Sequence, residues 1–195
     1  GSAFARYLGS IGLPTLLWIR EKDILREALE TRENAAFLPG FRFPDTVGFT
    51  DDLRESATFG DAVFIAVPSQ FCRSVYTRIA PVLRRDQVVV SLTKGFDKKT
   101  LMRMSQVMEE VFRPHARPRL AVLSGPSFAK EVAAGHPTAL VVASRETSAA
   151  REVQHLISSL SLRAYTSADV TGVESFREQF NETVVTTRLL RAVEH

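Results

Sequence analysis

The chain has 195 residues, of which 45% are hydrophobic and 24% are charged, so it can bury a core and has the composition of a folded domain. Its net charge of +3 is a weak excess, and the basic residues do not form the stripe that a nucleic-acid groove requires. The longest apolar runs, such as residues 62–67, are far shorter than the roughly 20 residues that span a bilayer. We therefore expect neither nucleic acid nor a membrane as a partner.

The cysteine and histidine content indicates a reducing environment and no metal. The single cysteine, Cys72, cannot form a disulfide within the chain, and no basic stretch followed by an apolar run marks a signal peptide. The four histidines are scattered, without a Cys/His spacing typical of a metal site. We expect a cytoplasmic protein that binds no metal.

Apolar strand-like runs alternate with amphipathic helical segments along the whole chain. The first half predicts a strand over 15–19, a helix over 21–34, a loop over 34–50 that runs into a short strand, a short helix capped by Asp51 or Asp52, a strand over 62–67 and a helix after Pro68. The second half predicts strands over 87–93, 119–125, 138–144 and about 162–166, with helices over about 98–112, 127–134 and 147–160.

The strands are nearly continuous aliphatic runs without a polar face, as in "AVFIAV" (62–67) and "ALVVA" (139–143). Strands buried on both sides have this pattern, and they occur in parallel sheets covered by helices. Alternation of strand and helix makes right-handed crossovers the default. The sequence therefore predicts an α/β fold with a doubly wound, mostly parallel sheet and helices on both faces.

Three successive predicted strands end in small, polar or kinked residues. In an open parallel sheet, ligands bind outside the carboxyl ends of the strands, where following helices offer unsatisfied N–H groups to an anion. The ammonium group of Lys94 can bind a phosphate or polarise a carbonyl oxygen. The residues expected to border this crevice are Ser69, Lys94, Ser124, Gly125 and Ser127.

Each of these residues also has an ordinary structural explanation. Serine, glycine and proline are common in turns, and a lysine in a turn is usually solvated. Residues 93–95, "TKG", lack the upstream glycine spacing of a phosphate-binding loop. The hypothesis of a phosphate or carbonyl ligand therefore depends on these residues meeting at one crevice.

Six segments in this order and spacing resemble bacterial NAD(P)-dependent glycerol-3-phosphate dehydrogenases, and the resemblance extends from near residue 1 to about Glu174. They are "NAAFLPGFRFP", "AVPSQ", "SLTKGFD", "LSGPSFAKEV", "GHPTALVVAS" and "YTSADVTGVE". Members of that family reduce dihydroxyacetone phosphate to sn-glycerol 3-phosphate with NADH or NADPH. The resemblance implies a Rossmann-like cofactor-binding domain, a phosphate-ester substrate, a role in supplying glycerophospholipid precursors and, as a further expectation, a homodimer.

The resemblance also implies roles for individual residues. Lys94 would be the catalytic lysine of this part of the chain and contact both substrate and nicotinamide, and Gly125 and Ser127 would contact the substrate. The implied cofactor contacts are Gly1, Arg20, Pro68, Lys94 and Ala129. An arginine after the second strand of a dinucleotide fold can hold the 2′-phosphate of NADP, so Arg20 favours NADP slightly over NAD.

Both ends of the chain depart from the family pattern. Gly1 aligns with the third glycine of the phosphate-binding turn, so the first strand and two earlier glycines are expected to be absent; alternatively, Gly1 and Ser2 are a remnant of cloning. At the other end, Phe180 stands where the family has its proton-donating lysine, and Asn181 stands where the paired asparagine belongs. We expect a dinucleotide-binding domain over 1–170 without its first strand, and over 171–195 the start of a helical substrate domain or a divergent tail.

These departures lead to the hypothesis that the chain by itself is weakly active or inactive as a dehydrogenase. A missing general acid alone typically costs about 10²–10⁴-fold in rate. Two alternatives stay open at this point. One is a related Rossmann ketone reductase with another substrate, and the other is a non-catalytic Rossmann-like domain that serves association.

Overall fold

The computed structural model describes residues 1–125, 128–175 and 183–187, and it consists of alternating helices and strands. The helices are α1 (Ser2–Ser10), α2 (Lys22–Thr31), α3 (Leu53–Thr58), α4 (Ser69–Ile79), α5 (Met104–Phe112), α6 (Ala129–Ala134), α7 (Thr147–Ile157) and α8 (Val170–Ser175). The strands are β1 (Thr15–Trp18), β2 (Val47–Thr50), β3 (Ala62–Ala66), β4 (Val88–Ser91), β5 (Arg119–Ser124), β6 (Thr138–Ala143), β7 (Leu162–Ser167) and β8 (Thr183–Thr187).

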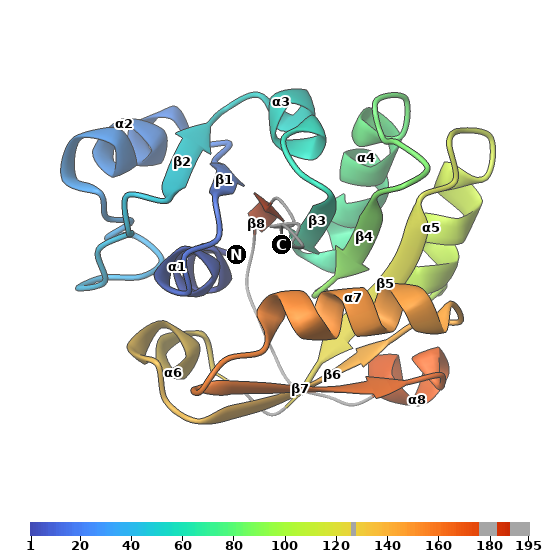
Figure 1. Cartoon of the computed structure of the whole chain (residues 1–195). Coiled ribbons are helices and arrows are strands. Elements are labelled where there is room, and N and C mark those ends of the chain that lie inside the picture. The colour runs from blue at the N-terminus through green and yellow to red at the C-terminus, as the bar shows by residue number, and fades with distance from the viewer. Residues whose placement is uncertain (126–127, 176–182, 188–195) are drawn as a thin grey trace, which may run out of the picture.

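All these strands belong to one sheet with the order β2-β1-β8-β3-β4-β5-β6-β7 (Figure 1). The pairs β1–β2, β3–β4, β4–β5 and β6–β7 are parallel. The pairs β1–β8, β3–β8 and β5–β6 are antiparallel. The sheet is therefore mostly parallel. Its antiparallel pairs are the two that β8 forms with its neighbours and the pair between β5 and β6.

Two hydrophobic cores lie on opposite faces of the sheet, and alternate residues of one strand serve both. In β3, Phe64 belongs to the first core, whereas Val63 and Ile65 belong to the second. The first core takes side chains from α1, α2, α6 and α7, and the second from α3, α4, α5 and α8. Because every face of a central strand is covered, the aliphatic runs need no polar face. The predicted doubly wound α/β fold is confirmed.

Strand β8 lies at the centre of the sheet, between β1 and β3. The usual doubly wound order, 3-2-1-4-5-6, places the first strand between the second and the fourth. Here β8 lies between β1 and β3 and runs antiparallel to both, with Val185 opposite Leu17 on one side and Phe64 on the other. The place that the first strand takes in the usual order is thus filled here by a late segment of the chain in the reverse direction.

One predicted helix begins later than the sequence suggested. The pattern favoured a helix from about residue 98, but α5 starts at Met104. Leu101 has a φ of 57°, which a right-handed helix does not permit, and the backbone of Phe96 pairs with that of Arg103 in an antiparallel bridge. The preceding residues form a closed turn around the Asp97 carboxylate instead.

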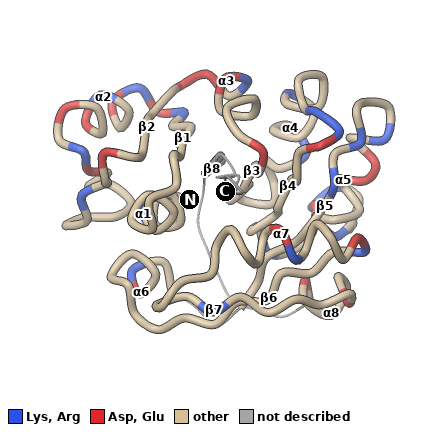
Figure 2. The backbone as a smooth tube through the Cα atoms, viewed as in Figure 1, with Lys and Arg blue, Asp and Glu red and all other residues tan. Residues whose placement is uncertain are grey.

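Charged residues of both signs occur on α2 and α3, whereas α4 carries only basic and α5 only acidic residues (Figure 2). Within the part of the chain that the structure describes, no helix has the length and apolarity to cross a membrane. The division into domains at residue 170 remains a prediction, since residues 176–182 and 188–195 lie outside the described residues.

Candidate functional site

The carboxyl ends of β1, β3, β4 and β5 share one edge of the sheet. Strands β1 and β3 are both antiparallel to β8 and are therefore parallel to each other, and β3, β4 and β5 are parallel neighbours. This edge is where a ligand of an open α/β sheet is expected to bind. Two pockets lie along it.

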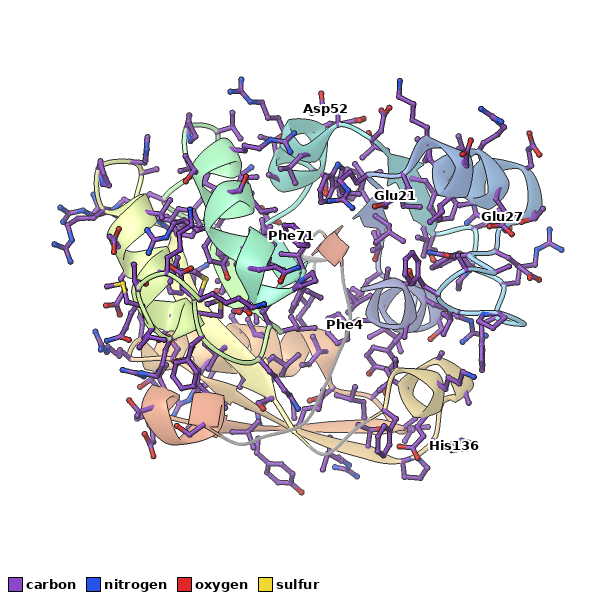
Figure 3. All side chains as sticks on the ribbon, turned by 180° about the vertical axis from the view of Figure 1, so that it is seen from behind. Phe4, Glu21, Glu27, Asp52, Phe71 and His136 are labelled. Atoms are coloured by element: carbon purple, nitrogen blue, oxygen red, sulfur yellow. The ribbon has the colours of Figure 1, made fainter. Side chains whose placement is uncertain are left out.

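The first pocket lies between the end of β1 and α4. The Arg20 guanidinium forms an ion pair of 2.6 Å with Glu21, and its central carbon lies 5.7 Å from the centroid of the Phe71 ring. Figure 3 labels Glu21 and Phe71, which come from the end of β1 and the first turn of α4. The lining also includes Trp18, Asn34, Val67, Pro68, Ser74 and Arg78. Arg20 and Pro68, both predicted site residues, therefore share one pocket.

The second pocket lies between α1, α6 and the ends of β3, β4 and β5. It is lined mostly by apolar side chains, and the buried hydroxyl of Ser124 is its notable polar group. Among the described residues, this hydroxyl has no hydrogen-bond partner. Three predicted site residues meet at this pocket, namely Gly1, Gly125 and Ala129.

The two pockets adjoin each other at the end of β3. Ala66 lines the second pocket and the next residue, Val67, lines the first. Counting the solvent at their mouths, they hold about 730 Å³ and 480 Å³ of empty space. Gly1, the N-cap of α1, lines the second pocket, so the unsatisfied N–H groups of that helix start at the same edge.

Lys94 lies just after β4, at the same edge of the sheet. The hydroxyl of the preceding Thr93 donates to the Val67 carbonyl at 2.7 Å, which ties the end of β4 to the end of β3. Lys94 is half-buried and its Nζ atom is buried. The sulfur of Cys72 lies 3.4 Å from the Thr93 hydroxyl, and burial raises the pKa of this thiol, which keeps it neutral.

The two glycines of these turns are required for different reasons. Gly95 has a φ of 93°, a conformation that other residues rarely adopt. A methyl group on Gly125 would lie 2.7 Å from the Ala139 carbonyl oxygen of β6. Gly125 is therefore required by the close approach of β6, independently of any ligand.

Ser127, a predicted substrate contact, lies outside the described residues, as do Phe180 and Asn181. The structure consequently brings together Gly1, Gly125 and Ala129 at one pocket and Arg20 and Pro68 at the adjoining one. Their roles in binding remain predictions.

Comparison with known proteins places these features in a family. Residues 1–150 match the family described as "NAD-dependent glycerol-3-phosphate dehydrogenase N-terminus". The chain belongs to this family.

Individual relatives carry the same name. A glycerol-3-phosphate dehydrogenase [NAD(P)+] of Koribacter versatilis is 43% identical over 175 residues, which are 89% of this chain and 52% of that protein. The protein of the same name from Syntrophomonas wolfei is 44% identical over 174 residues, 89% of this chain and 51% of that protein. The crystal structure of glycerol-3-phosphate dehydrogenase from Coxiella burnetii superposes with a TM-score of 0.82 at 31% identity and covers 89% of this chain and 53% of that one.

The chain spans about half the length of the curated relatives that it matches. The relatives are NAD(P)-dependent by name, and the Rossmann-type fold of the family agrees with the sheet seen here. Structures at lower identity, such as a UDP-D-ManNAc dehydrogenase from Pyrococcus horikoshii at 13% and a TM-score of 0.70, share the fold alone.

The chemistry of the residues at the two pockets fits groups of a dinucleotide. The Ser124 hydroxyl, which has no hydrogen-bond partner among the described residues, offers a polar group in a mostly apolar pocket, as expected where a ligand group completes the hydrogen bonding. The Arg20 guanidinium and the Phe71 ring provide a cation and an aromatic face in the other pocket.

The sequence analysis missed two residues of the first pocket. Phe71 is 40% exposed in the first turn of α4, and an exposed aromatic residue directly after "AVPSQ" could have indicated it. Asn34 is buried, and its side-chain amide donates to the Ser2 hydroxyl at 3.0 Å. This bond links the loop after α2 to the start of α1, which no local pattern could reveal.

Proposed function

We propose that the chain is the cofactor-binding part of an NAD(P)-dependent glycerol-3-phosphate dehydrogenase, an enzyme that reduces dihydroxyacetone phosphate to sn-glycerol 3-phosphate. The observation that supports this most is the pair of adjoining pockets at the carboxyl edge of the sheet, which gather Arg20 and Pro68 in one and Gly1, Gly125 and Ala129 in the other. The family assignment over residues 1–150 supports the same proposal.

Arg20 is the residue proposed to favour NADP slightly over NAD. Its guanidinium lies at the first pocket, held between the Glu21 carboxylate and the Phe71 ring. A 2′-phosphate could replace Glu21 as the partner of this guanidinium, since Arg binds phosphate oxygens with two parallel hydrogen bonds. Arg78 lines the same pocket and adds a second positive charge.

Lys94 is proposed to hold the substrate. Its ammonium group, buried next to the end of β4, would neutralise the phosphate ester or polarise the ketone oxygen. Gly125 and Ser127 would contact the same substrate, through a backbone N–H and a hydroxyl. The nicotinamide cofactor, when bound, supplies the hydride.

The chain is proposed to be weakly active or inactive alone, because a second lysine should donate the proton to the forming alkoxide and Phe180 stands in its place. Loss of a general acid alone costs about 10²–10⁴-fold in rate.

Calorimetric titration of the purified chain with NADH and NADPH tests the proposal. We expect saturable binding of both cofactors, somewhat tighter for NADPH, and a turnover of dihydroxyacetone phosphate far below that of a complete dehydrogenase. Absence of binding for both cofactors would refute cofactor binding, and full turnover would refute the proposed inactivity. A cytoplasmic location and a homodimer remain predictions from the sequence.

A further inference from the structure

The loop that carries Lys94 is fastened at both ends to the segment formed by the end of β3 and α4. At the inner end, the Thr93 hydroxyl donates to the Val67 carbonyl at 2.7 Å. At the outer end, Nε of Arg73, on α4, donates to Oδ2 of Asp97 at 3.0 Å. Lys94 therefore lies between two anchors that belong to the same neighbouring unit.

Asp97 is the centre of the outer anchor. It is 5% exposed, and its Oδ2 also accepts a hydrogen bond of 2.7 Å from the Thr100 hydroxyl. Its backbone N–H donates to the Met102 carbonyl at 2.9 Å, and its carbonyl accepts from the Leu101 N–H at 2.8 Å. A carboxylate buried to this extent is stable only with such partners, so the turn has one shape as long as the carboxylate is charged and paired.

The backbone between the two anchors is short, because three residues separate Thr93 from Asp97. Gly95 has a φ of 93°, and a Cβ added to it would lie 3.8 Å from the Ser69 hydroxyl at the start of α4. Lys94 directly precedes this glycine, and its Nζ atom is buried. The direction of the Lys94 side chain thus depends on where the outer anchor holds the loop.

We propose that Asp97 is a positioning residue for Lys94. Its ion pair with Arg73 fixes the outer end of the loop, so that the Lys94 ammonium group stays at the carboxyl edge of the sheet in the place where it meets a phosphate ester. This inference rests on the proposed function, because it takes Lys94 as the substrate-binding ammonium group. Small displacements of such a group cost much binding and rate.

Chemical labelling of the full chain with pyridoxal 5′-phosphate tests the inference. This phosphate ester carries an aldehyde that forms an imine with a lysine amine and releases water, and borohydride then reduces the imine to a stable amine. Mass spectrometry of the peptides gives the labelling rate of Lys94 relative to Lys22 and Lys130, which are exposed on α2 and α6, away from this loop, and serve as internal standards. The measurement requires no cofactor and no turnover.

Asp97→Asn is the test variant. We expect the labelling ratio of Lys94 to rise at least about fivefold, because the freed loop exposes the amine. We also expect glycerol 3-phosphate to protect Lys94 from labelling in the unaltered chain and to protect it poorly in Asp97→Asn. A purely structural role of Asp97 would raise the labelling of all lysines together and would leave the ratio unchanged.

Glu110→Gln is the matched control. Nη1 of Arg73 donates to the Glu110 carboxylate at 2.7 Å, so this variant removes an ion pair from the same arginine without touching the loop. The labelling rate of Lys94 relative to the standard lysines should stay at the value of the unaltered chain. Arg73→Ala, in contrast, should raise the ratio as Asp97→Asn does, and the double variant should raise it no further, because both changes break one anchor.

An unchanged Lys94 ratio in a folded Asp97→Asn variant overturns the inference. If that variant fails to fold, Arg73→Ala replaces it, since this change breaks the same ion pair from the other side; an unchanged ratio there overturns the inference equally. Failure of the proposed function appears elsewhere, as an unaltered chain that binds neither NADH nor NADPH. The two failures are therefore distinguishable.

Discussion

Glu174 of α8 and Ser105 of α5 are joined by two hydrogen bonds. The backbone N–H of Ser105 donates to Oε1 of Glu174 at 2.8 Å, and the Ser105 hydroxyl donates to Oε2 at 2.6 Å. Arg103 adds an ion pair of 3.2 Å to the same carboxylate. The Glu174 side chain is 8% exposed, so a negative charge at the start of α5 is both buried and paired. This contact fastens α8 to the body of the sheet.

Glu174→Gln should therefore lower the free energy of unfolding by about 1–3 kcal/mol, since an amide cannot accept from Ser105 and pair with Arg103 as the carboxylate does. Denaturant unfolding followed by circular dichroism measures the change. Glu30→Gln on the exposed end of α2 is the control and should have almost no effect. Equal, small effects of both substitutions would show that Glu174 does not hold α8.

Arg20→Gln should weaken NADPH binding about tenfold or more and change NADH binding by less than about threefold, because only NADPH carries the 2′-phosphate. Calorimetric titration of each cofactor measures the two constants. Arg26→Gln, a change of an exposed arginine on α2, serves as the control for net charge. If both cofactors lose affinity equally in Arg20→Gln, then the guanidinium acts through its packing on Phe71 and not through a phosphate.

The stability of the fold should depend on Asp97 at acid pH. The Thr100 hydroxyl, and next the Arg73 guanidinium, lower the pKa of Asp97 below its usual range. A carboxyl group whose pKa is lower in the folded state stabilises the fold above the unfolded pKa of about 3.9 and loses this contribution as the pH falls through the folded pKa. The unfolding free energy of Asp97→Asn should therefore fall less steeply below about pH 4 than that of the unaltered chain. Parallel acid titrations of the two proteins would contradict the shift.

Val185→Pro tests the role of β8 at the centre of the sheet. Proline removes a backbone donor from a strand that is paired on both sides, so we expect a loss of about 3 kcal/mol or more in unfolding free energy. Hydrogen exchange should accelerate in β1 and β3, which both pair with β8. Thr183→Pro is the matched control, because proline is tolerated at the first residue of a strand. Unchanged exchange in β1 and β3 would argue against β8 in this position.

The sequence by itself determined the buried strands and the class of the fold. Uninterrupted aliphatic runs such as residues 62–66 and 88–90 are stable only in strands that are covered on both faces. This requirement depends on consecutive residues alone, so the sequence is sufficient to predict it.

The late start of α5 shows where local patterns were insufficient. The residues after Lys94 have adequate helix propensity, but Asp97 gains more from a turn in which Arg73 and Thr100 satisfy its buried carboxylate. Arg73 lies on a different helix, α4, and it reaches Asp97 only because α4 packs beside the loop. A local sequence pattern contains no information about this contact.

The tertiary structure alone decided what fills the centre of the sheet and which residues meet at its edge. Residues 183–187 are a short segment whose pairing partners lie more than a hundred residues earlier in the chain. Such a strand is stabilised mainly by its pairing with β1 and β3 and only weakly by its own strand propensity. Arg20 lies near Phe71, and Gly1 lines the same pocket as Gly125, only because the strands lie side by side in the sheet. The residues of each pocket are distant in the sequence, so no local pattern indicates that they meet.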